Sequence, residues 1–136
     1  MKDLVSGIVS TRVVAVEGGK ARKHEIKDNG NYFFESGIHV LEYISDETTC
    51  RLEFDDLSLM MRRTNADYTH EFTFHSDFKV TGFLKYPFGD IEASGKTYNY
   101  GTYMGDDGEI AIDLEYELNI QDEVTKYDVK FDFTQK

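Results

Sequence analysis

The sequence predicts an all-β protein, a closed antiparallel β-barrel with mostly up-and-down connections. The first observation is the alternation of apolar and polar residues, which is typical of strands with one face in a core and one in water. The second is the spacing of turn signals, which separate about ten or eleven strand candidates at intervals of about 8–12 residues. No segment shows sustained helical periodicity. Because most neighbouring candidates are joined by short turns, we expect the sheet to close on itself.

The clearest alternation lies in the segment 108–133. Apolar side chains occupy every second position in 110–120, and acidic or amide side chains fill most of the gaps. A polar break at 121–123 interrupts the pattern, which then resumes. This arrangement predicts an antiparallel hairpin with Leu114 and Phe131 in the core and Glu–Lys pairs across its outer face.

Shorter strands are expected upstream of this hairpin, bounded by turn signals. The segment 20–27 is polar and rich in lysine, which is typical of an exposed edge strand protected against strand addition. Residues 28–30 predict a turn, Gly95 a bulge or kink, and 100–108 a longer loop. The predicted strands are 4–16, 20–27, 32–34, 38–44, 48–54, 57–63, 67–75, 78–86 and 89–98.

Length and charge exclude several classes of function. The chain has 136 residues, which we expect to form a single domain over 1–136. It carries 26 acidic and 15 basic residues, for a net charge of -11. This balance argues against binding to nucleic acid, which needs a basic surface, and to anionic membranes. The evenly distributed charge favours a role in solubility.

Cysteine content and the first residues indicate a compartment. Cys50 is the only cysteine, so no internal disulfide can form, and its run of neighbours predicts a small core residue. Neither a signal peptide nor a long apolar stretch is evident. We therefore expect a cytosolic protein.

Four short patterns resemble a known family, the YwiB-like proteins, which are uncharacterised bacterial β-barrels of lipocalin-like (calycin) type. They span most of the chain. Ser45, Thr64 and Tyr86 stand where the family often has glutamate, glycine and threonine. The resemblance implies the fold and implies no activity. The patterns are Leu41-Glu42-Tyr43, Met61-Arg62 with Phe72 ten residues on, Tyr86-Pro87-Phe88-Gly89, and the strand 110–116 after a glycine–acidic turn.

Arg62 is the first candidate site residue. It alternates with Leu57, Leu59 and Met61, so only one of these two faces can point inward. If Arg62 faces the lumen, its guanidinium would grip the carboxylate of a ligand. If it faces outward, a structural salt bridge to one of the acidic residues accounts for it. The family resemblance favours the inward placement.

Other polar residues offer weaker signals. Tyr68, His70, Phe72 and Phe74 share one strand face, where a lone histidine is typical of a hydrogen-bonded core residue, with a catalytic base as the alternative. His24, His39, His70 and His75 show no zinc-ligand spacing, and we expect no metal and no cofactor. The acidic run 106–109 lacks the spacing of a calcium loop and is typical of a solvated turn.

Small barrels either fill with side chains or hold one small ligand. We expect binding of a small apolar, amphipathic or carboxylate ligand in the lumen, without nucleic-acid or membrane partners and without assigned catalytic residues. One alternative is a structural or interaction protein with a filled lumen that acts as a homodimer. Another is an enzyme that uses His70 or Arg62 in the lumen. A ligand needs about 300 Å³ of connected cavity, so the cavity volume distinguishes the ligand-binding protein from the structural protein with a filled lumen. The predicted ligand-binding residues are Arg62, Tyr68, His70, Phe72, Phe74 and Tyr116.

Overall fold

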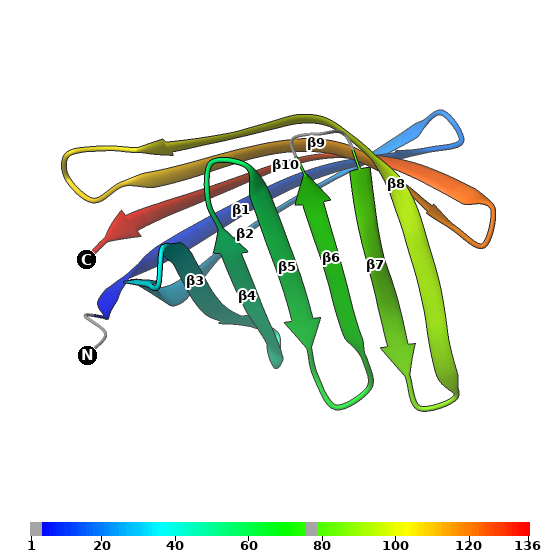
Figure 1. The fold of residues 1–136 in the computed structure, drawn as a ribbon, viewed down its shortest axis with the longest axis horizontal. Coiled ribbons are helices and arrows are strands. Elements are labelled where there is room, and N and C mark those ends of the chain that lie inside the picture. The colour runs from blue at the N-terminus through cyan, green and yellow to red at the C-terminus, as the bar shows by residue number, and fades with distance from the viewer. Residues whose placement is uncertain (1–3, 76–78) are drawn as a thin grey trace.

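The computed structural model describes residues 4–75 and 79–136, which form ten antiparallel strands. Each strand pairs with its neighbours in sequence, and β1 also pairs with β10, so the sheet closes into a barrel (Figure 1). This confirms the predicted closed, up-and-down barrel. The strands are β1 (Val5–Glu17), β2 (Lys20–Glu35), β3 (Ile38–Ser45), β4 (Thr48–Phe54), β5 (Ser58–Thr64), β6 (Thr69–His75), β7 (Lys79–Tyr86), β8 (Gly89–Met104), β9 (Ile110–Ile120) and β10 (Glu123–Gln135).

Very short turns produce this simple strand order. Gln121 and Asp122 join β9 to β10, and both have positive φ. Asp46 and Glu47 do the same between β3 and β4. Two successive left-handed residues give the turn whose twist matches the twist of the flanking strands, so each hairpin keeps its two strands adjacent. The described residues include no helix long and apolar enough to cross a membrane.

The alternation of apolar and polar residues places the apolar side chains in the interior of the barrel. Leu114 and Phe131 are buried, as predicted, and lie in one core cluster with the rings of Phe54, Phe74 and Phe133. Their neighbours along each strand point outward, because successive side chains of a strand project to opposite faces. The hairpin also places Lys126 opposite Glu117 and Lys130 opposite Asp113 on the outer face, which matches the predicted opposition of charges.

One side of the barrel consists of long strands and the other of short strands. The long strands β1, β2, β9 and β10 cross the short strands β4–β7 at a steep angle, and β8 bends to follow both (Figure 1). The bend contains a bulge between Thr97 and Asn99. The bulge was expected at Gly95, which instead lies close to the carbonyl of Glu117 on β9. Glycine at that position lets the two backbones approach.

Two predicted breaks are wrong. Residues 28–30 continue β2, because Asp28 stays paired with Val9 of β1. Residues 100–104 belong to β8, because they pair with the first part of β9. Glycine and asparagine signals are overridden here by pairing with a continuous neighbour. The exposed-edge prediction for 20–27 is confirmed, since this segment pairs with β1 and joins β3 only beyond it.

The two ends of the barrel differ. At one end, the hydroxyl of Tyr100 on β8 donates hydrogen bonds to the carbonyl oxygens of Asp55 (2.6 Å) and Ser58 (3.2 Å) in the β4–β5 turn. This side chain links strands that are far apart around the barrel and helps to cover that end. The other end, where β3 turns into β4 and β5 into β6, carries a row of polar side chains on its inner wall. We call it the mouth.

Candidate functional site

A row of polar side chains runs around the inner wall at the mouth. Tyr43 of β3 lies opposite Cys50 of β4, Cys50 opposite Arg63 of β5, and Arg63 opposite His70 of β6. Directly opposed residues project to the same face of a sheet, and Cys50 and Tyr43 belong to the buried core. Four strands thus bring a phenol, a thiol, a guanidinium and an imidazole to one level of the lumen.

The predicted inward placement of Arg62 is wrong. Its guanidinium lies on the outer face and donates hydrogen bonds from Nη2 (2.6 Å) and Nε (2.9 Å) to Oε1 of Glu71. The inner face of β5 carries Leu59 and Met61, which are buried, and the next residue of the same parity is Arg63. Arg62 therefore forms the structural ion pair that was the alternative interpretation.

Arg63 occupies the inward position that was expected for Arg62. It stays accessible to solvent at the mouth while its chain enters the lumen, and its charge is retained at all ordinary pH values. Among the described residues, no aspartate or glutamate forms an ion pair with it. Its polar neighbours are Cys50, Tyr43 and Tyr68. The guanidinium is thus a lumen-facing cation without a carboxylate partner.

An aromatic group flanks Arg63 on the β6–β7 side, and we call it the aromatic shelf: Tyr68, His70, Tyr86 and Phe88. The rings of Tyr68 and His70 stack at 4.1 Å, and those of Tyr86 and Phe88 at 4.9 Å. Nε2 of His70 lies 3.1 Å from the hydroxyl of Tyr86. Partial burial lowers the pKa of His70, and the positive charge of Arg63 lowers it further.

The other predicted lumen residues face inward but fill the interior. Phe72 and Phe74 of β6 are buried, and the ring of Phe74 packs 4.5 Å from that of Tyr116. Burial raises the pKa of Tyr116, as it does that of Tyr43, so both phenols stay protonated. Of the six predicted residues, the structure brings Tyr68 and His70 to the mouth next to Arg63.

A cavity of about 80 Å³ is lined in part by Arg63. A ligand pocket ordinarily needs about 300 Å³, whereas each water takes about 30 Å³. This cavity therefore has no room for a whole fatty acid. The cavity is lined by Thr11, Val13, Tyr43, Met61, Arg63, Tyr116, Tyr127, Val129 and Phe131.

The described residues contain no cluster of three or more His, Cys, Asp or Glu side chains suited to a metal ion. The acidic segment Asp106–Glu109 lies in the β8–β9 turn. There the amide of Gly105 donates to the carbonyl of Glu109 at 2.8 Å, which closes the turn. Of the four histidines, His39 lies away from the mouth, with Nδ1 2.7 Å from the hydroxyl of Tyr32.

Sequence reasoning missed Arg63, although a signal was present. Residues 59, 61 and 63 share one parity, and extending the apolar pair Leu59 and Met61 by one step reaches Arg63. The predicted strand 57–63 ends at that residue. The pairing of Arg63 with both Cys50 and His70 shows that the strand continues through it.

Comparison with known proteins supports the fold and leaves chemistry open. The crystal structure of the ywiB protein from Bacillus subtilis superposes with a TM-score of 0.85 at 13% identity, covering 98% of this chain and 93% of that one. A Bacteroides ovatus structure of unknown function covers 98% of this chain and 41% of that one, at 14% identity and a TM-score of 0.31. No curated protein matches the sequence. Residues 8–130 match the domain of unknown function DUF1934, and the chain belongs to that family.

Proposed function

We propose that this barrel binds a small aromatic or amphipathic carboxylate at its mouth, with Arg63 pairing with the carboxylate. The observation that carries the proposal is the unpaired charge of Arg63. The chain contains 26 acidic residues, and other arginines use them: Arg51 pairs with Glu42 and Glu53, and Arg62 with Glu71. A guanidinium turned into the lumen without such a partner is suited to an external anion.

The aromatic shelf would bind the aromatic or apolar part of the ligand. Phe88 is 79% exposed, although it stacks on Tyr86, and both lie on the same side as His70. Flat ring faces at the edge of a cavity bind planar apolar groups. Because the cavity has a volume of about 80 Å³, the carboxylate would enter it and the body of the ligand would rest on the shelf. We also propose that the barrel is of the calycin type and that the protein is cytoplasmic.

A second function is favoured by the same cavity volume. Side chains fill most of the lumen, which is the arrangement expected of a structural or interaction protein. In that case, Arg63 would serve solubility at the mouth. The enzyme hypothesis would depend on His70 and Tyr86, the titratable pair within hydrogen-bond reach beside the cavity.

The test uses the fluorescent aromatic carboxylate 2-naphthoate as the probe. We expect the wild-type protein to bind it and Arg63→Met to bind it at least about tenfold more weakly, which corresponds to about 1.4 kcal/mol. Arg62→Met is the matched control, because it removes the same charge from the adjacent residue on the outer face. We expect its affinity to change by less than about twofold.

Two results would contradict the proposal. If the wild-type protein binds no 2-naphthoate, the ligand is of another class. If Arg62→Met and Arg63→Met lose affinity equally, binding reflects net charge and Arg63 is not the anchor. Native mass spectrometry of freshly purified protein complements the titration, because it reports a retained ligand and the number of subunits together.

A further inference from the structure

The open edge of β2 has hydrogen-bonding groups that the barrel does not use. The segment 20–29 pairs with β1 along one side, whereas β2 meets β3 only from Gly30 onwards. Among the described residues, no backbone hydrogen bond joins this segment to any strand except β1. The hairpin of β1 and β2 projects beyond the short strands (Figure 1). An unpaired strand edge is a template for another extended chain.

The charge of this edge is opposite to that of the molecule. The segment 20–29 contains four cations, Lys20, Arg22, Lys23 and Lys27, against two acids, Glu25 and Asp28, in a chain of net charge -11. Lys20 and Arg22 share one face of the strand, and Lys23 and Lys27 share the other. The cations therefore flank the edge on both faces of the sheet.

The neighbouring strand does not neutralise these lysines. Lys23 lies opposite Val14 of β1, and Lys27 lies opposite Ser10. No described acid forms an ion pair with either lysine. The guanidinium of Arg22 is 3.6 Å from Glu17, but its side chain is 78% exposed, and such pairs contribute little.

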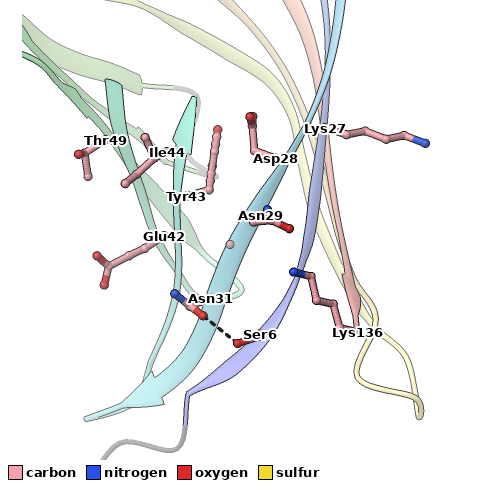
Figure 2. A pocket seen from close by; sticks show the side chains of 11 residues that line it. Ser6, Lys27, Asp28, Asn29, Asn31, Glu42, Tyr43, Ile44, Thr49 and Lys136 are labelled. Carbon is pink, nitrogen blue, oxygen red and sulfur yellow. Dashed lines mark hydrogen bonds between the residues drawn. The ribbon is translucent and has the colours of Figure 1, made fainter. Parts of the chain in front are cut away.

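A groove lies where β3 separates from β2, at one end of the open edge. It has a volume of about 600 Å³ and is lined by residues of both strands together with Ser6, Thr49 and Lys136 (Figure 2). Lys27 and Asp28 project to opposite sides of β2 there. Ile44, which is 64% exposed, lies on the β3 side of the groove. An added strand would continue the direction of β3 from this groove along the edge.

We propose that the edge formed by residues 20–29 binds an extended acidic segment of a partner protein by strand addition. Backbone hydrogen bonds would supply affinity, and the cations on both faces would select a segment with carboxylates on both of its faces. A second copy of the chain is disfavoured as the occupant, because two such edges would place lysines against lysines. This inference does not depend on the proposed carboxylate site at Arg63.

The experiment uses a fluorescein-labelled peptide of repeated Glu-Glu-Thr triplets, long enough to span residues 20–29. We expect Lys23→Gln/Lys27→Gln to weaken binding by at least about fivefold. Lys79→Gln/Lys96→Gln is the matched control, since these exposed lysines lie opposite each other on β7 and β8. The control should change affinity by less than about twofold. Hydrogen exchange should show protection of amides within 20–29 when the peptide is bound.

A peptide of the same sequence, N-methylated at alternate residues, separates strand addition from general attraction of charge. It keeps every carboxylate and loses the donors along one edge, so we expect it to bind at least about tenfold more weakly. Equal binding of the two peptides, equal loss in both lysine variants, or no binding by the wild-type protein would overturn the proposal. Concentration-dependent protection of the edge without peptide would assign it to a second copy. Arg63→Met should leave peptide binding unchanged. A failure of the carboxylate proposal at the mouth can therefore be distinguished from a failure of the strand-addition proposal.

Discussion

Arg63 of β5 and His70 of β6 lie directly opposite each other on the inner face of the barrel. Burial lowers the pKa of His70, and the positive charge of Arg63 lowers it further. His70 is therefore neutral at physiological pH, and Arg63 carries the positive charge of the mouth. A bound anion at Arg63 would raise the pKa of His70 and so favour its protonated form.

This relationship predicts that carboxylate binding depends on pH. An anion at Arg63 raises the pKa of His70, so binding takes up a proton, and affinity for 2-naphthoate should rise from pH 8 to pH 6 by on the order of threefold. Titrations at several pH values measure this slope. His70→Gln should bind with no such slope, and an equal slope in that variant would show that another group titrates.

The lowered pKa of His70 also determines how its contribution to stability changes with pH. In the free protein, the pKa of His70 lies below its usual value of about 6.5, so the unfolded chain binds the proton more tightly. The contribution of His70 to stability is therefore present above pH 6.5 and is lost as pH falls through its folded pKa. The wild-type protein should lose more stability than His70→Gln over this range, measured by urea unfolding.

The core of the β9–β10 hairpin gives a prediction about packing. Leu114 is fully buried, so Leu114→Ala should lower the free energy of unfolding by about 2–5 kcal/mol. The adjacent Glu115 is exposed, and Glu115→Ala should change it by less than about 0.5 kcal/mol. Chemical denaturation measures both variants. A loss below about 0.5 kcal/mol for Leu114→Ala would mean that the two faces are inverted.

Two glycines of β8 should respond differently to the same substitution. A Cβ at Gly95 would collide with the carbonyl oxygen of Glu117, which is backbone and cannot move aside. Gly95→Ala should therefore destabilise the protein by about 1–3 kcal/mol. A Cβ at Gly101 would meet nothing within 4 Å, so Gly101→Ala should be nearly neutral. Thermal unfolding distinguishes them, and equal melting temperatures would contradict the close approach of β8 and β9.

The covered end of the barrel gives a prediction about hydrogen bonding. Tyr100→Phe removes the hydroxyl that donates to Asp55 and Ser58, which should cost about 1–2 kcal/mol of unfolding free energy. Tyr103 is 62% exposed, so Tyr103→Phe is the control and should have little effect. If both variants unfold at the same denaturant concentration, the link across this end contributes nothing to stability.

The lysines of the β2 edge should also prevent self-association. Lys23→Val/Lys27→Val removes charge from an unpaired edge, so we expect dimers or larger species in light scattering at high concentration. Lys79→Val/Lys96→Val makes the same change on strands that are paired on both sides. A monodisperse Lys23→Val/Lys27→Val protein would show that the lysines do not protect the edge.

The sequence by itself determined the class of fold and most of the inward face. Alternation with a period of two is a local property, so it identified the burial of Leu114 and Phe131 and the shared face of Tyr68, His70 and Phe74 without knowledge of the partner strands. Short turns between strands then implied closure, because adjacent strands joined in this way pair in sequence order.

The tertiary structure decided where strands continue and what the lumen contains. Asp28 stays in β2 because Val9 of β1 holds its backbone in register, a constraint that the local turn signal does not contain. Arg63 became a site residue through its place between Cys50 and His70 on two other strands. The volume of about 80 Å³ depends on side chains from strands on opposite sides of the barrel. Such packing is a sum over long-range contacts, so it follows from the closed barrel and not from any one segment.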